Sequence, residues 1–233
     1  MKETYDLSDL QMLARDCLTR AGVSGAVAQI VARDVALSEA GGRAEAGFSS
    51  LLRDIRLVRY GRLYPDAEVS LDALAPAVIR VDAGHGFAAA AVAQAVPLLV
   101  DTARAQGMAM LHLIHASDPG PLTGAMAEIA ASGLAAVLVR PQGNAFAIRP
   151  MERQVSALDH GAQSMLSAFM NDAPMVADSP LEGPMMETAW LTALDPGLTA
   201  AEELLAHLPD LSGTPMPGTV ALAPELLAQI VNA

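Results

Sequence analysis

Asp159 and His160 are adjacent residues of the types that serve in acid–base catalysis. They directly follow an apolar stretch that reads as a strand ending at Leu158, and a carboxylate at a strand end is often functional. Aspartate also favours turns for local reasons. A functional pair and a strand-ending turn therefore explain these residues equally well, and both interpretations stay open.

A second candidate is the run Gly84-His85-Gly86, which lies between a predicted strand and a predicted helix. Phosphates bind at helix N-termini in such places. The full G-x-G-x-x-G spacing is missing, however, because Ala89 stands where the third glycine would be. A tight strand-to-helix turn is the favoured interpretation.

The remaining reactive side chains give little support to other chemistry. No two histidines have the i, i+4 spacing of a helical metal site, so no metal is expected. No serine lies in a G-x-S-x-G motif, so nucleophilic hydrolysis is not indicated. Cys17, the single cysteine, lies in an apolar helical pattern typical of an inert buried thiol.

Composition excludes several classes of protein. The 233 residues are 52% hydrophobic, which allows a sizeable core. Aromatics make up 3% and the net charge is −12, so a surface that binds nucleic acid is not expected. The first residues do not resemble a signal peptide, and the most apolar stretch, 87–100, is too short to span a membrane. We expect a cytoplasmic protein.

Hydrophobic periodicity predicts helices first and then alternating strands and helices, an α/β or α+β pattern. Ser8 is the expected N-cap of the first helix. The other predicted helices cover 24–40, 48–59, 87–105, 123–131, 198–207 and 224–231. The predicted strands cover 77–82, 108–115, 134–139, 145–148, 154–158 and 187–194. We predict a helical N-terminal part over 1–70 and an α/β core over 71–233, which together form one compact unit.

Two runs, 42–47 and 115–120, resemble signature stretches of the type-2 malate/L-lactate dehydrogenase family, which read Ser-His-Gly and Ser-x-His. Further resemblance follows in the same order along most of the chain. It includes Ala21-Gly22-Val23-Ser24, the run from Val81 to Phe87, the run from Gly143 to Ile148, and Leu158-Asp159-His160-Gly161-Ala162.

This resemblance implies a non-Rossmann nicotinamide-binding fold, with the helical N-terminal part packed on a mixed sheet, and a dimeric protein. It implies NAD(P)H as cofactor and a small 2-oxo, 2-hydroxy or 2-imino acid as substrate. It also implies a catalytic role for Asp159. The residues expected to line the cofactor are Ser117, Gly124, Gly143, Asn144 and His160.

The family pattern is broken at the residues that would move the proton. Ala46 and Pro119 stand in place of the two histidines, Glu45 in place of the serine, and Ser50 in place of an arginine. Two family stretches, a cofactor loop after Val139 and a Lys-Gly region near 178–184, are missing. Hydride transfer to a ketone or imine needs a proton donor, usually histidine, and loss of such a group costs about 10² to 10⁴ in rate. Glu45 and His115 are the candidates to replace it.

Two functions are therefore expected from this sequence. The first is a diverged NAD(P)H-linked oxidoreductase that acts as a homodimer. The alternative is a redox-inactive paralogue, either a partner subunit in a heteromer or a repurposed lyase or cyclase.

Overall fold

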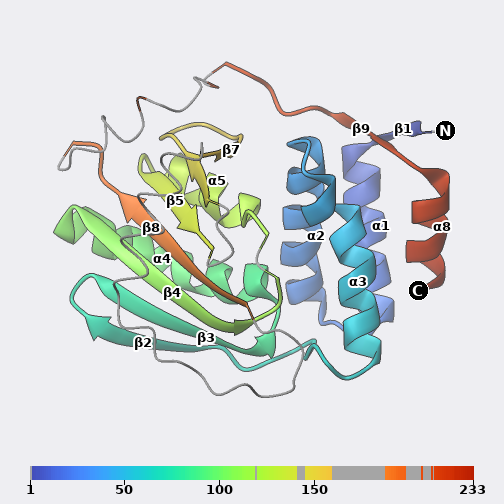
Figure 1. Cartoon of the computed structure of the whole chain (residues 1–233), viewed down its shortest axis with the longest axis horizontal. Helices are drawn as coiled ribbons and strands as arrows, with labels where there is room; N and C mark the ends of the chain where they lie inside the picture. The colour runs from blue at the N-terminus through green and yellow to red at the C-terminus, as the bar shows by residue number, and fades with distance from the viewer. Residues whose placement is uncertain are drawn as a thin grey trace.

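The computed structural model describes residues 2–118, 120–140, 145–158, 187–197, 206, 211 and 213–233. It shows a sheet covered by helices beside a group of upright helices (Figure 1). The candidate functional residues lie where these two parts meet.

Three helices make up most of the N-terminal part: α1 (Leu7–Arg20), α2 (Gly25–Ala40) and α3 (Phe48–Arg59). The predicted cap at Ser8 is wrong. Asp6 caps α1 instead, because its carboxylate accepts hydrogen bonds from the backbone N–H groups of Ser8 (2.8 Å) and Asp9 (3.4 Å). A short 3-10 helix, η1 (Ala44–Ala46), joins α2 to α3.

Within the part of the chain that the structure describes, the main sheet has seven strands in the order β2-β3-β4-β8-β5-β6-β7. Their bounds are β2 (Ser70–Ala75), β3 (Val78–Gly86), β4 (Met108–Ala116), β5 (Ala135–Val139), β6 (Ala145–Ile148), β7 (Ser156–Ala157) and β8 (Glu187–Leu194). Strands β3 and β4 are parallel and every other pair in this sheet is antiparallel. The predicted mixed α/β architecture is confirmed.

The parallel pair is connected by α4 (Ala88–Gln106), as a parallel connection requires. Alanines on one side of α4, such as Ala91 and Ala95, are fully buried among strand residues such as Leu111 and Leu113. Their small size brings the helix close to the sheet. Helix α5 (Thr123–Ala131) packs on the same core through Met126.

The last elements of the chain lie with the first. Strand β1 (Glu3–Asp6) pairs antiparallel with β9 (Thr219–Leu222), and α8 (Pro224–Asn232) stands beside α3 (Figure 1). Val220, Leu222 and Ile230 are buried in the cluster formed by the N-terminal helices. Residues 219–232 thus pack on the N-terminal part, whereas the predicted division placed them with the α/β core. The predicted boundary between the two parts at residue 70 stays a prediction.

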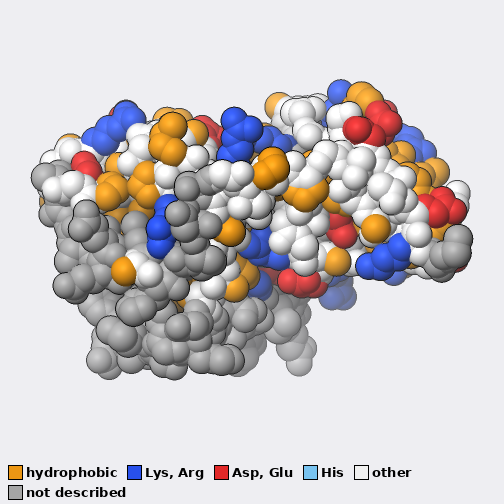
Figure 2. All heavy atoms as spheres, turned by 90° about the horizontal axis from the view of Figure 1, so that it is seen from above, with side chains coloured by type: hydrophobic (Ala, Val, Ile, Leu, Met, Phe, Trp, Pro, Cys, Tyr) orange, Lys and Arg blue, Asp and Glu red, His pale blue; other side chains and the backbone are white. Residues whose placement is uncertain are grey.

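Charges of both signs are interspersed on the face shown in Figure 2, with hydrophobic side chains scattered between them. Within the described residues, no helix has both the length and the apolar character to cross a membrane.

Candidate functional site

The two runs singled out in the sequence meet at one small cavity. The first contributes Ala46 from η1, and the second contributes Ser117, Asp118 and Gly120. The methyl carbon of Ala46 lies only 3.2 Å from the position that a Cβ at Gly120 would take. The other lining residues are Val31, Asp34, Val35, Ser50, Arg53, Asp54, Phe87 and Ala89.

This cavity has a volume of about 30 Å³. That is enough for one or two water molecules and too little for an organic substrate. At position 46 the wall offers a methyl group, which cannot transfer a proton. Any substrate would have to bind at the rim of this cavity or open it.

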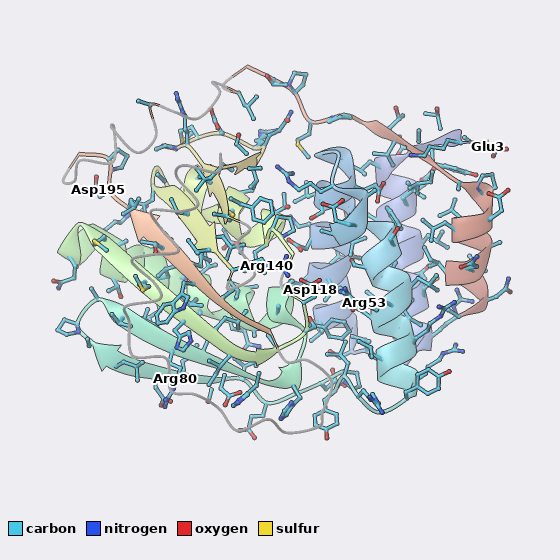
Figure 3. All side chains as sticks on the ribbon, in the orientation of Figure 1. Glu3, Arg53, Arg80, Asp118, Arg140 and Asp195 are labelled. Atoms are coloured by element: carbon cyan, nitrogen blue, oxygen red, sulfur yellow. The ribbon has the colours of Figure 1, made fainter. Side chains whose placement is uncertain are left out.

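Two arginines hold Asp118 at the junction between the helices and the sheet (Figure 3). Arg53 of α3 donates to one carboxylate oxygen at 3.0 Å, and Arg140, which follows β5, donates to the other at 2.8 Å. Burial by itself would raise the pKa of Asp118, but the Gly120 N–H and the two guanidinium groups outweigh it and lower this pKa. Asp118 is therefore a fixed anion that ties three separate segments together.

Two further carboxylates belong to the wall: Asp54 is buried and Asp34 is partly buried. Asp54, beside Arg53 on α3, is 6% exposed, and burial raises its pKa to about 6 although Arg53 acts in the opposite direction. Burial also raises the pKa of Asp34 to about 6, against the hydrogen bond that Asp34 accepts from the Gly124 N–H. Carboxyl groups with such pKa values change charge close to neutral pH.

His115 lies at the end of β4 and belongs to a different cluster. Its Nδ1 is 3.0 Å from a carboxylate oxygen of Asp82 on β3. Its ring stacks on that of His85, with centroids 5.5 Å apart, and Tyr64 meets His85 edge-on. Burial by itself would raise the pKa of Asp82, but the Gly84 N–H and His115 outweigh it, so the pKa is lowered.

The structure brings some of the predicted site residues to the cavity and leaves others away from it. Ser117 lines the cavity, but its hydroxyl already accepts a hydrogen bond from the Ala88 N–H (3.1 Å). The Gly124 N–H is likewise bound, to Asp34 at 2.7 Å. Glu45 is exposed on η1 and is not among the lining residues. Gly143, Asn144, Asp159, His160 and Pro119 lie outside the described residues.

Sequence reasoning missed the pairing of Asp118 with Arg53 and Arg140. Asp118 was visible as a charged residue inside the second run, but its partners come from positions 53 and 140. Among the residues that the structure describes, no group of three or more histidine, cysteine or acidic side chains is arranged to hold a metal ion.

Comparison with protein-family models gives a match to malate/L-lactate dehydrogenase over residues 5–151, which contains both runs around the cavity. The chain belongs to the malate/L-lactate dehydrogenase family. The family predicted from the two runs is thereby confirmed.

Curated members of the family are similar to this chain over part of their length. A Δ1-pyrroline-2-carboxylate reductase of Pseudomonas fluorescens is 33% identical over 135 residues, 57% of this chain and 40% of the relative. A (2R)-3-sulfolactate dehydrogenase (NADP+) of Chromohalobacter salexigens is 30% identical over 137 residues, 59% of this chain and 41% of the relative. The chain thus matches about two fifths of the length of these relatives.

Solved structures show the same fold over the whole chain. A dehydrogenase from Sinorhizobium meliloti superimposes with a TM-score of 0.71 at 14% identity, covering 100% of both chains. A Δ1-piperideine-2-carboxylate reductase from Pseudomonas syringae gives 0.66 at 18% identity, covering 99% of both. The dehydrogenase-like, non-Rossmann fold expected from the sequence is confirmed.

Proposed function

We propose that this chain is a diverged NAD(P)H-linked oxidoreductase of a small 2-imino, 2-oxo or 2-hydroxy acid. The observation that carries the proposal is the meeting of the two family runs at one cavity, beside a cluster of arginines. Relatives named as reductases of cyclic 2-imino acids and as a dehydrogenase of a 2-hydroxy acid support this substrate class.

Arg53 is the side chain best suited to bind the carboxylate of such an acid. Its guanidinium group is at the cavity, and 43% of the side chain is exposed, so an anion can reach it from solvent. Arginine binds carboxylates through two parallel hydrogen bonds, which would fix the orientation of a small acid. Asp118 and Asp54 hold this guanidinium in place before a substrate arrives.

The described residues fit a nicotinamide cofactor in two respects. Helix α4 begins at the carboxyl ends of the parallel strands β3 and β4, where ligands bind in many α/β sheets. The exposed rings of Tyr64 and His85 beside it can stack on a flat ring. Gly124 would shape this region, because its N–H is already bound to Asp34. The Ser117 hydroxyl accepts the Ala88 N–H and still has its own proton to donate to a cofactor. Roles for Gly143, Asn144, His160 and Asp159 remain part of the proposal.

The proposal is tested by calorimetric titration with NADH and NADPH, followed by turnover of Δ1-pyrroline-2-carboxylate, Δ1-piperideine-2-carboxylate and pyruvate. We expect binding at millimolar cofactor or below and oxidation of the reduced nicotinamide by at least one substrate. Arg53→Met should raise the KM for the acid, while Arg15→Met, which changes an exposed arginine on α1, should not. Absence of both binding and turnover would refute the proposal.

The alternative function is a redox-inactive partner subunit or a non-redox enzyme such as a lyase or cyclase. Ala46 and the small volume of the cavity favour it, because neither an imidazole nor space for a substrate is present there. Co-purification from the native source distinguishes the two proposals. A stable heteromer without turnover supports the alternative, and a homodimer that oxidises NAD(P)H contradicts it.

A further inference from the structure

We propose that His115, held by Asp82 and stacked on His85, is the proton donor of the reduction and replaces the histidine missing at position 46. This inference rests on the proposed oxidoreductase function. It assigns the catalytic proton to the end of β4, outside the cavity that contains Ala46.

The contact with Asp82 sets the orientation of the His115 imidazole. Nδ1 of His115 lies 3.0 Å from the Asp82 carboxylate, so this nitrogen carries the proton that the carboxylate accepts. Nε2 is then the atom that faces a substrate. A carboxylate behind an imidazole fixes its tautomer and its orientation.

The backbone at His85 and His115 adopts an uncommon conformation. His85 has φ of 65° and His115 has φ of 50°, in the left-handed region that side chains with a Cβ rarely adopt. Neighbouring contacts maintain this conformation at His85. Its carbonyl accepts the Tyr64 N–H at 2.9 Å, and a Cβ at Gly84 would lie 2.7 Å from the carbonyl oxygen of Glu68. Residues held in sparsely populated backbone conformations cluster at active sites and ligand-binding sites.

His115 lies at an edge of the sheet where a ligand can bind. Asp82, His85 and His115 gather at the carboxyl ends of the parallel strands β3 and β4, where α/β sheets commonly bind ligands. Ser117, two residues after His115, lines the cavity. The His115 side chain is 43% exposed, so a substrate can approach it from solvent.

Other candidates are less well placed. His112, on the same strand, stacks face to face on Trp190 at 3.9 Å, and burial lowers its pKa, which favours the neutral form. Glu45 is exposed and away from the cavity wall. Asp54 faces the cavity but is almost completely buried.

The proposed reaction with an imino acid is a two-electron reduction of its C=N bond. A bound reduced nicotinamide would supply a hydride to the imine carbon and be oxidised. The electron pair of the C=N bond moves to nitrogen, which takes the proton from Nε2 of His115, so the imine is reduced to an amine. His115 regains a proton from solvent. For a 2-oxo acid, the carbonyl oxygen takes the proton in the same way.

The test measures pre-steady-state nicotinamide oxidation and, separately, cofactor affinity by calorimetry. His115→Gln should lower the rate of hydride transfer by about 10² to 10⁴ and leave the cofactor Kd within threefold. The matched control His112→Gln, on the same strand, should stay within threefold in both. Asp82→Asn should slow the reaction and change its pH profile, to which His85 and Tyr64 are the other titratable neighbours.

A second arm separates a catalytic role from a structural one. Introducing Ala46→His into the His115→Gln protein should recover at least tenfold of the rate, because it returns an imidazole to the wall of the neighbouring cavity. Circular dichroism establishes folding of each variant, and His115→Asn substitutes for His115→Gln if the latter does not fold. Hydride transfer within threefold of wild type in either folded variant overturns the inference while the oxidoreductase function stands. A wild-type protein that neither binds nor oxidises NAD(P)H refutes both.

Discussion

Asp54 is a buried carboxylate whose ionisation opposes folding. Burial raises its pKa from 3.8 to about 6 in the folded protein. Between these two pH values the folded state holds a proton that the unfolded state has released. The resulting stabilisation is complete below about pH 4 and is lost as the pH rises through 6.

Asp54→Asn therefore should become more stable relative to wild type as the pH rises. We expect the difference in unfolding free energy between the two proteins to change by about 2–3 kcal/mol from pH 4 to pH 7.5, measured by urea denaturation. Asp101→Asn, which changes an exposed residue of α4, is the control and should show little dependence on pH. A pH-independent difference for Asp54→Asn would contradict the burial argument.

Asp118 is expected to contribute to stability because it neutralises two guanidinium groups. The Arg140 side chain is only 10% exposed, so Asp118→Ala removes an anionic partner from a largely buried cation. We expect a loss of about 2–4 kcal/mol in unfolding free energy. Asp72→Ala, which breaks the exposed pair with Arg80, should cost less than about 1 kcal/mol. Equal losses for the two variants would show that burial does not set the strength of the Asp118 pair.

The site was only partly predictable from single residues. The two runs that resemble family signatures contribute Ala46 and Ser117 to one cavity, while the roles expected of the site residues stay predictions. The partners of Asp118 and His115 could not be predicted, because each comes from a different element and depends on how helices and strands pack. Asp82 reaches His115 only because β3 and β4 are parallel and Asp82 pairs with Ile114, next to His115.

Among the elements, helices with a buried face were predicted well and exposed strands were not. The bounds of α3 and α5 agree with the hydrophobic periodicity. Strand β2 was missed because all six of its residues are exposed, so it lacks the alternation that marks a half-buried strand. Strands β1 and β9 were missed because only their mutual pairing creates them. The helix predicted over 198–207 falls almost entirely outside the described residues.

Helices α2 and α5 are joined by a buried contact between two hydroxyl groups. Ser38 and Thr123 are 0% and 1% exposed, and their oxygens are 3.0 Å apart. Ser38→Ala leaves the Thr123 hydroxyl without this partner and should cost about 1–3 kcal/mol. The double variant Ser38→Ala/Thr123→Val removes both polar groups and should recover part of this loss, as measured by thermal unfolding. A loss of unfolding free energy in the double variant that exceeds the sum of the losses in the two single variants would contradict this account.

At the scale of the whole molecule, the C-terminal helix completes the N-terminal core. Ile230 of α8 is 1% exposed, whereas its neighbour Val231 is 40% exposed. Ile230→Ala should lower the unfolding free energy by about 2–4 kcal/mol, and Val231→Ala by less than about 1 kcal/mol. Similar effects for the two variants would indicate that α8 does not pack as described.

The pairing of β1 with β9 also has a consequence for biosynthesis. Residues 3–6 leave the ribosome long before residues 219–222, with which they pair. At about 5–20 residues per second, the interval is roughly 10–40 seconds. During this time the apolar surface of the N-terminal helices that later covers Val220 and Ile230 is open to solvent. Until translation reaches α8, the N-terminal helices therefore lack the residues that cover this surface in the folded protein.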